Sequence, residues 1–356
     1  MNFDSFEYTA FPSKVFFGEK SFDNIIKVLM PYQKAFVIAE KRQEPYVNLI
    51  KEKVGTEKAF HFTKVIQHVP AELVEEAKKI QQQERTDVLV AIGGGSAIGL
   101  AKALALASNH DIIAVPTTYA GSEMTNIWGI TTAEGKTTGR DMRVLPEVVI
   151  YDPAMTATLP VSLAATSAMN AMAHLMEAVY GHDTNPISYN NSLDGMKKLQ
   201  QGMNILSEQK KLTPAANRLL QYGSFLAGKG LCEVSMSLHH KLAHVLGGTF
   251  GLDHSSVHTV LQAFVLEYQW DALSQEVQND FCQALEHPYP PSALLALAKN
   301  MGAPTSLAEI GFDKINIEKV VAITLSKPYA NPKPLQADDL QIMLQRAFQG
   351  ALIRNS

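Results

Sequence analysis

The sequence predicts an α/β domain built on a parallel sheet, followed by an all-helical domain. The chain has 356 residues, which is more than one hydrophobic core usually supports, so two domains are expected. Short β-rich runs alternate with helical spacing in the first half, and after YDPAMTATLP (Tyr151–Pro160) almost only helical spacing remains. We therefore expect residues 1–155 to form the α/β domain and residues 156–356 to form the helical domain.

The strands of the first domain are predicted from short runs of apolar and β-branched residues. These runs do not alternate with polar residues, which indicates strands buried on both faces of a parallel sheet. Between two of them, Glu72–Gln83 carries Leu73, Val74, Ala77 and Ile80 at helical spacing. The expected strands are Lys14–Phe17, Ala35–Ala39, Ala59–Phe62, Val88–Ile92, Ile112–Val115 and Val148–Tyr151.

The second domain is predicted from segments with apolar residues at helical spacing, separated by loops such as GHDTNPI (Gly181–Ile187) and ALEHPYPPSA (Ala284–Ala293). The expected helices are Leu163–Tyr180, Ser188–Gln201, Ala215–Leu231, Met236–Leu246, Ser255–Tyr268, Gln275–Gln283, Ser292–Asn300 and Ile317–Leu325.

Composition excludes several classes of protein. Hydrophobic residues make up 46% and charged residues 19%, with a formal net charge of −4, so nothing points to binding of nucleic acid or of an anionic membrane. The N-terminus lacks a basic region followed by an apolar core, and no apolar run is long enough to span a bilayer. Cys232 and Cys282 give no disulfide framework or zinc spacing. A cytoplasmic location is expected.

A glycine turn follows the strand Val88–Ile92, in VLVAIGGGSAIGLAKALALA (Val88–Ala107). Gly93, Gly94 and Gly95 allow a close backbone approach, and a helix beginning near Ser96 would direct its N–H groups at an anion such as a pyrophosphate. The turn is neither the GxGxxG fingerprint nor a P-loop, and a purely structural turn remains the alternative.

The next strand is followed by PTTYAGSEMT, which places the hydroxyl groups of Thr117, Thr118, Ser122 and Thr125 at the edge where open α/β sheets bind ligands. A polar turn that caps the next segment explains these residues equally well. Glu40 ends the strand Ala35–Ala39, where a carboxylate can accept hydrogen bonds from an adenosine ribose; a solvated charge is the alternative.

Histidines gather in the second domain, in SLHHKLAHVLGGTFGLDHSSVH (Ser237–His258) and in SAMNAMAHLMEAVYG (Ser167–Gly181). His240 and His244 stand four residues apart and share a helix face, and that helix is expected to stop at Gly247–Gly248. His254 opens another helix, and His174 lies four residues after Asn170. Imidazoles at this density suit zinc or ferrous iron, or act as general acids near neutral pH.

These motifs, together with GGGSAIGLAK, PTTYAGSEMT and the DP…LP boundary, resemble the iron-containing (group III) alcohol dehydrogenase family over nearly the whole chain. The resemblance implies the fold shared with dehydroquinate synthase: an N-terminal dinucleotide-binding α/β domain and an all-α C-terminal domain, with the active site between them. Metal-dependent members hold one divalent ion with an aspartate and three histidines, and the corresponding positions here are Asn170, His174, His240 and His254. The family also implies a homodimer.

Two departures from the metal-dependent pattern stand out. Asparagine replaces the aspartate at position 170, and Gly99 replaces the aspartate that usually follows GGGS. In both departures the sequence resembles one branch of the family. That branch reduces the C=C bond of 2-maleylacetate to 3-oxoadipate with NADH or NADPH, in aromatic compound degradation, and it is regarded as metal-independent.

The resemblance implies a role for each candidate residue. NADH or NADPH would lie on Glu40, on the turn Gly93–Ser96, and on Thr117, Thr118, Ser122 and Thr125. His244 or His254 would donate a proton, with His174, His240 and Lys241 as further donors to the developing charge. The dicarboxylate substrate would contact Asn170 and be held by Arg140, Arg143 or Lys241. A solvated loop charge explains Arg140 and Arg143 at least as well, and on an ideal helix the Lys241 side chain diverges from the histidines.

Three alternatives stay open at this point. The first is a metal-dependent (Fe or Zn) dehydrogenase of a small alcohol or aldehyde, with Asn170 as a weak ligand. The second is a cyclising lyase like dehydroquinate synthase, which shares the two-domain plan and uses NAD. The third is a nucleotide-binding protein without catalysis.

Overall fold

The computed structural model describes residues 5–354, apart from the side chain of Lys136. The described chain divides into two compact units. The α/β unit runs from Ala10 to Leu159, and the helical unit contains the chain from Pro160 onward together with the described residues up to Thr9. Tyr8 anchors this N-terminal segment, since its hydroxyl donates to Glu233 Oε1 at 3.1 Å.

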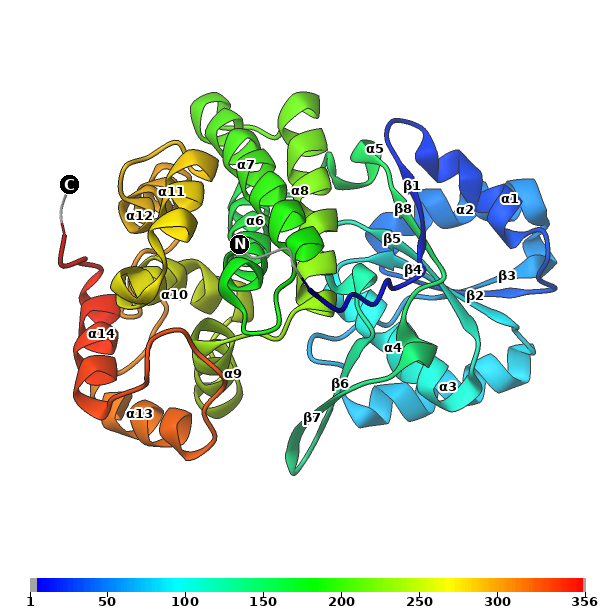
Figure 1. The fold of residues 1–356 in the computed structure, drawn as a ribbon. Coiled ribbons are helices and arrows are strands. Elements are labelled where there is room, and N and C mark those ends of the chain that lie inside the picture. Colours follow the sequence, from blue (N-terminus) through cyan, green and yellow to red (C-terminus); the bar gives the residue numbers. More distant parts are fainter. Residues whose placement is uncertain (1–4, 355–356) are drawn as a thin grey trace. The chain divides into compact units, whose positions relative to one another are not determined.

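A parallel sheet of six strands forms the centre of the α/β unit, in the order β1-β8-β5-β4-β2-β3 (Figure 1). Each strand was expected from the sequence, with β4 and β5 one or two residues longer than predicted. The strands are β1 (Lys14–Phe17), β2 (Ala35–Ala39), β3 (Ala59–Phe62), β4 (Val88–Gly93), β5 (Asp111–Pro116) and β8 (Val148–Tyr151).

Helices cover both faces of this sheet, which explains why its strands lack alternation. In β2, Val37 packs with the core beneath α1 (Asn24–Leu29) and α2 (Glu44–Val54). Its neighbours Phe36 and Ile38 pack with α3 (Ala71–Glu84) and α4 (Gly95–Ser108). Successive side chains therefore enter different apolar layers, as expected for a strand buried on both sides.

A second, two-stranded sheet was not predicted. It is the antiparallel hairpin of β6 (Ile127–Thr132) and β7 (Gly135–Arg140). Apart from Lys136, whose side chain is not described, the residues of the hairpin are half-buried or exposed, so it lacks the buried apolar runs from which the other strands were predicted. A Cβ on Gly139 would lie 2.8 Å from the Trp128 ring, so the pairing depends on a glycine facing an indole.

The helical unit contains no strand among its described residues, as expected. At its centre, α6 (Val161–Tyr180) is buried along its length from Ser167 and packs against α7, α8 and α10 (Figure 1). The other helices are α7 (Pro186–Gln209), α8 (Pro214–Glu233), α9 (Leu238–Phe250), α10 (His254–Gln269), α11 (Gln275–Ala284), α12 (Pro290–Asn300), α13 (Ile317–Ser326) and α14 (Ala337–Gln349). A single-turn helix, α5 (Pro153–Thr156), precedes the boundary in the α/β unit.

The predicted end of α9 at Gly247–Gly248 is wrong. The helix continues to Phe250 and ends at Gly251, whose φ of 68° is the left-handed conformation that glycine adopts readily. Two interior glycines cost the helix about 1 kcal/mol each. Burial of Leu238, Leu242 and Leu246 on the opposite face offsets this cost.

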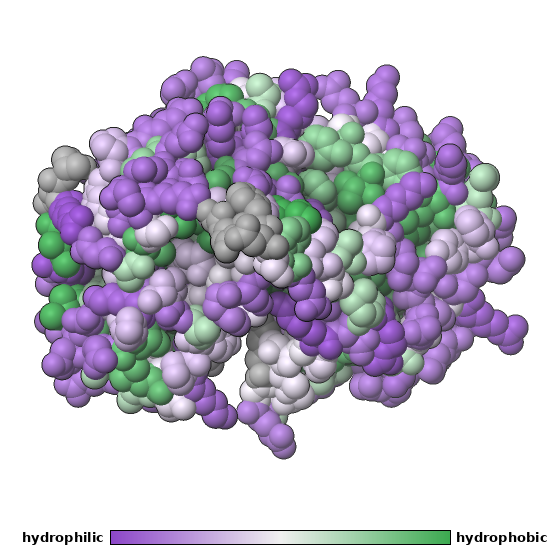
Figure 2. Space-filling view, in the orientation of Figure 1, coloured by the Kyte–Doolittle hydropathy of each residue, from purple (hydrophilic) through white to green (hydrophobic). Residues whose placement is uncertain are grey.

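The surface agrees with the composition. Hydrophilic side chains cover most of the face seen in Figure 2, and exposed large apolar residues such as Met30 and Ile315 belong to different units. In the part of the chain that the structure describes, no helix is long and apolar enough to cross a membrane.

Candidate active site

The glycine turn opens α4 as predicted. Gly94 is the N-cap residue, and its carbonyl accepts the amides of Ala97 (3.1 Å) and Ile98 (3.2 Å). The amides of Gly95 and Ser96 precede the first intrahelical bond, so they can bind an anion. A Cβ on Gly94 would lie 2.9 Å from Thr118 Cγ2. Only glycine lets the turn and the Thr118 side chain approach this closely.

Thr117 lies beside the same turn. Its amide donates to Gly93 O at 3.0 Å, and its buried hydroxyl oxygen has no hydrogen-bond partner among the described residues. A buried hydroxyl without a hydrogen-bond partner destabilises the folded protein, and a bound ligand can supply that partner. Thr117, Thr118 and the turn therefore form a cradle that suits the phosphates and ribose of a dinucleotide.

Lys102, which the sequence analysis did not single out, holds the loop beyond this cradle. Its side chain is buried in α4, and its Nζ donates to Ser122 O at 2.6 Å, Thr125 O at 2.7 Å, Thr125 Oγ1 at 2.9 Å and Ile127 O at 3.0 Å. The Thr125 hydroxyl also donates to Ser122 O at 3.1 Å. The structure thus gives Thr125 and the Ser122 carbonyl a structural role in the loop.

Three other predicted residues of the α/β unit have partners within the protein. Glu40 is paired with Arg42 Nε at 2.7 Å, and Arg140 donates to Asn126 Oδ1 at 3.2 Å. Arg143 binds Asp141 at 2.6 Å and donates to Leu106 O at 2.9 Å. Asp141 is the N-cap residue of the turn that contains Arg143, so these contacts shape the chain after β7.

The histidines of the helical unit do come together, around a buried carboxylate that the sequence analysis missed. Glu177 of α6 accepts the backbone amides of Ser237 (2.9 Å), His239 (2.7 Å) and His240 (3.3 Å) at the start of α9. It also lies 2.6 Å from His240 Nδ1. A carboxylate at a helix N-terminus is stabilised by the helix dipole and by the amides that have no partner within the helix.

His240 and His174 form the first string of imidazoles. His240 Nδ1 donates to Glu177, so its Nε2 accepts the proton of His174 Nδ1 across 2.8 Å. Burial lowers the pKa of His240 well below its usual value, which is consistent with a neutral ring. Glu177 therefore fixes the tautomer of His240 and, through it, the orientation of His174.

A second string joins His239, His258 and His254. His239 Nε2 lies 2.8 Å from His258 Nδ1, and His258 Nε2 lies 3.1 Å from His254 Nε2. Burial lowers the pKa of His239 to about 3 and that of His258 well below its usual value, so both rings are neutral. His254, in contrast, is half-buried.

The exposed end of the cluster is formed by His244. Its ring lies 6.5 Å from the His254 ring and 6.4 Å from the His240 ring, between centroids. Its Nδ1 lies 3.3 Å from the Tyr329 hydroxyl. The structure thus brings together four histidines predicted from the sequence, and it adds His239, His258, Glu177 and Tyr329.

A signal for three of these additions was present in the sequence. His258 stands four residues after His254, and Glu177 stands three residues after His174, so each shares a helix face with a predicted residue. His239 is adjacent to His240. Tyr329 carries no such signal, because it lies on a loop 85 residues from His244.

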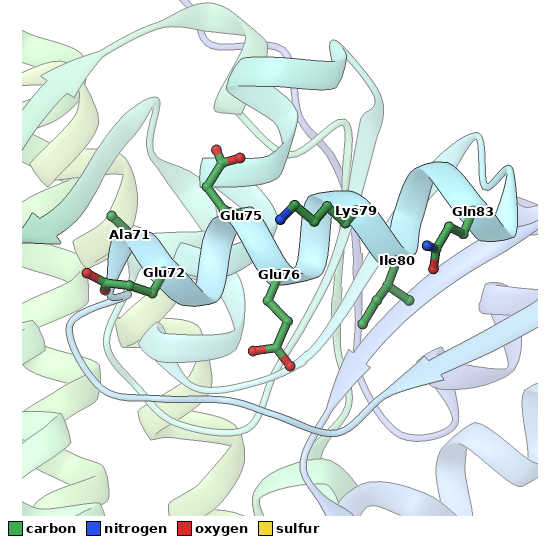
Figure 3. A pocket seen from close by; sticks show the side chains of 7 residues that line it. All are labelled: Ala71, Glu72, Glu75, Glu76, Lys79, Ile80 and Gln83. Carbon is green, nitrogen blue, oxygen red and sulfur yellow. The ribbon is translucent and has the colours of Figure 1, made fainter.

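A surface pocket of the α/β unit, by contrast, contains none of the predicted residues. It is lined by seven residues of α3, and their charged side chains point to different sides of the helix (Figure 3). Glu76 is paired with Lys64 at 2.5 Å. This is a solvated helix face.

Comparisons with known proteins decide the family. The model "Iron-containing alcohol dehydrogenase" matches residues 12–153, and its C-terminal counterpart "Fe-containing alcohol dehydrogenase family, C-terminal" matches residues 164–348. The chain belongs to the iron-containing alcohol dehydrogenase family. The family resemblance and the fold class predicted from the sequence are thereby confirmed.

Within this family, curated relatives are similar over almost the full length. A maleylacetate reductase of Burkholderia cepacia is 37% identical, covering 98% of this chain and 99% of its own. One of Pseudomonas sp. (strain P51) is 40% identical, covering 90% and 91%.

Solved structures agree. Maleylacetate reductase of Rhizobium sp. strain MTP-10005 is 34% identical, with a TM-score of 0.92 and coverage of 98% of this chain and 99% of its own. An iron-containing alcohol dehydrogenase of Corynebacterium glutamicum is also 34% identical, with a TM-score of 0.89 and coverage of 97% of both chains.

The family name implies an iron ion, and the residues at the expected positions do not fit one. Imidazole nitrogens bound to one tetrahedral ion at about 2.1 Å lie about 3.4 Å apart, whereas His174 Nδ1 and His240 Nε2 are 2.8 Å apart and share a proton. Asn170 contributes a neutral amide whose buried Oδ1 has no hydrogen-bond partner among the described residues. Those residues contain no group of three His, Cys, Asp or Glu side chains placed to hold a metal.

Proposed function

We propose that this chain is an NAD(P)H-dependent oxidoreductase that reduces the C=C bond of 2-maleylacetate to give 3-oxoadipate. The observation that carries the proposal is the similarity, at 37–40% identity over nearly the whole chain, to relatives named maleylacetate reductase. The histidine cluster, with an amide at position 170, supports the same reaction.

NADH or NADPH, when bound, supplies the hydride. The residues that would hold it are the turn Gly93–Ser96, Thr117 and Thr118, because they offer helix amides and a buried hydroxyl without a partner. Lys102 keeps the loop beyond them in place. Glu40 remains our candidate for the ribose, in an ion pair with Arg42.

Hydride addition to the alkene β to the keto group leaves an enolate, which must be stabilised and protonated. His244 is exposed and His254 is half-buried, so both can exchange protons with water. His239, His240 and His258 are buried and neutral, and they position the outer rings. We therefore keep His244 and His254 as the proton donors and assign His240, whose two ring nitrogens are occupied by Glu177 and His174, to positioning His174.

We also propose that the reaction needs no metal ion. An enolate spreads its charge over a conjugated system, so neutral hydrogen-bond donors can stabilise it where an alkoxide would require a stronger electrophile. The neutral amide of Asn170 and the hydrogen bond between His174 and His240 support this proposal.

The test is NAD(P)H oxidation by the purified protein with maleylacetate, after dialysis against a strong chelator and with metal content measured by elemental analysis. We expect full activity when the protein retains well under about 0.1 metal ion per chain. So small a metal-bound fraction could support only a small part of the activity if the reaction required a metal. Loss of activity on chelation, with recovery on addition of Fe²⁺ or Zn²⁺, would instead favour the metal-dependent dehydrogenase.

We propose a cytoplasmic homodimer as the working form. Neither Cys232 nor Cys282 forms a disulfide, which suits a reducing compartment. Light scattering coupled to size-exclusion chromatography tests the dimer directly.

A further inference from the structure

The loop between α13 and α14, residues 327–336, lies against α9 through Tyr329. The Tyr329 hydroxyl is 3.3 Å from His244 Nδ1, and its ring centroid is 5.6 Å from Lys241 Nζ. Lys241 and His244 are three residues apart on the same helix. The tyrosine therefore contacts both side chains, although it comes from a distant part of the sequence.

Two positively charged side chains of this region, Lys241 of α9 and Lys327 of the loop, have no acidic partner in the part of the chain that the structure describes. Neither Lys241 nor Lys327 lies within 4.0 Å of a carboxylate among the described residues. Burial and the charge of Lys327 lower the pKa of Lys241, so the two ammonium groups repel each other. Lys333, in the same loop, is by contrast paired with Asp339 at 2.9 Å.

The loop is held firmly where it carries these groups. Asn331 accepts the amide of Leu238, at the first residue of α9, at 3.3 Å, and its Nδ2 donates to Gln269 Oε1 at 3.0 Å and to Lys333 O at 2.6 Å. Gln269 is fully buried in α10. The backbone is thus anchored two residues after Tyr329, which lowers the entropy that the loop loses on binding a ligand.

We propose that Lys241, Lys327 and the Tyr329 hydroxyl bind one carboxylate of the dicarboxylate substrate, next to His244; this inference rests on the proposed function. A carboxylate accepts a hydrogen bond from each of the three groups and relieves the repulsion between the two lysines. A neutral alcohol or aldehyde gains nothing there. Lys327 and Tyr329 therefore determine specificity for an anionic substrate.

The experiment compares Lys327→Gln with Lys333→Gln, which removes the same charge from the same loop. The affinity for 3-oxoadipate is measured by calorimetry, and KM for maleylacetate and for NADH by steady-state kinetics. We expect Lys327→Gln to weaken 3-oxoadipate binding and raise KM for maleylacetate about tenfold. KM for NADH should change less than about twofold, and Lys333→Gln should change none of the three values by more than that.

The outcomes separate the two proposals. If the wild-type protein oxidises NADH with maleylacetate and both variants behave alike, the carboxylate site is wrong and the proposed function stands. If the wild-type protein does not turn over maleylacetate at all, the proposed function fails. In that case binding of 3-oxoadipate that depends on Lys327 but not on Lys333 would still support the anion site, and equal binding by both variants would overturn it.

Discussion

Asn170 shows how one side chain alters a site without altering its scaffold. It lies on α6, one helical turn before His174, and its Oδ1 is buried. An amide cannot supply the negative charge with which an aspartate offsets a divalent ion, and it is a poorer donor. The surrounding imidazoles instead bond to each other and to Glu177.

Asn170→Asp should raise metal affinity. The added carboxylate supplies charge at the position where the family's metal-dependent members carry a ligand, so we expect Zn²⁺ to bind at least about tenfold more tightly in calorimetry. Asn190→Asp, at an exposed position on α7, is the matched control for added charge. Equal affinities of the two variants would mean that the side chain at position 170 does not limit metal binding.

At the scale of elements, the glycine turn is the feature whose geometry is most demanding. Strand β4 ends at Gly93, and α4 begins two residues later. The strand and the helix were predicted from apolar runs and spacing. The contact that makes Gly94 necessary was not, because Thr118 comes from the loop after β5.

Gly94→Ala should weaken cofactor binding. The new Cβ would lie 2.9 Å from Thr118 Cγ2, so the turn or the threonine must move. We expect the Kd for NADH, measured by fluorescence titration, to rise at least about tenfold, as a loss of one or two good hydrogen bonds would produce. Adding Thr118→Ser removes the clashing methyl group and should recover part of the affinity.

Gly248→Ala is the control for this prediction, since nothing lies within 4 Å of the added Cβ. An unchanged Kd in the Gly94 variant would show that the cofactor does not depend on this turn.

At the scale of the whole molecule, the buried histidines make stability depend on pH. Burial lowers the pKa values of His239, His240 and His258, so these rings are neutral in the folded protein. The unfolded chain takes up protons at its histidines below about pH 6.5. Stability contributed by these rings is therefore present above that pH and is lost as pH falls toward the folded values.

Each such histidine lowers the free energy of unfolding by up to about 1.4 kcal/mol for every pH unit below pH 6.5. Burial raises the pKa values of the Glu177, Glu123 and Glu147 carboxyls, which act in the opposite direction. It also lowers the pKa of His110, which adds to the effect of the buried histidines. The net expectation is a clear fall in the thermal unfolding midpoint between pH 7.5 and pH 5.5.

The slope against pH provides the check. His258→Asn should flatten it by about one proton, whereas His182→Asn, at an exposed position, should leave it unchanged. Identical slopes in the two variants would contradict a role for the buried cluster.

The sequence by itself determined the α/β and helical halves, the strands of the parallel sheet, the glycine turn and the gathering of His174, His240 and His254. These features arise from local spacing, apolar runs and backbone freedom, which depend only on residues close together in the sequence. It did not reveal the hairpin β6–β7, whose residues are only partly buried, or the continuation of α9 through Gly247 and Gly248.

Tertiary structure alone decided which groups meet. Glu177 holds His240 from another helix, Lys102 holds a loop that follows the next strand, and Tyr329 reaches His244 and Lys241 from a distant loop. On an ideal helix Lys241 diverges from His240, its neighbour in the chain, but shares a face with His244 three residues later, and Tyr329 of another segment contacts both Lys241 and His244. Such contacts depend on packing between segments far apart in the chain, which no local pattern encodes.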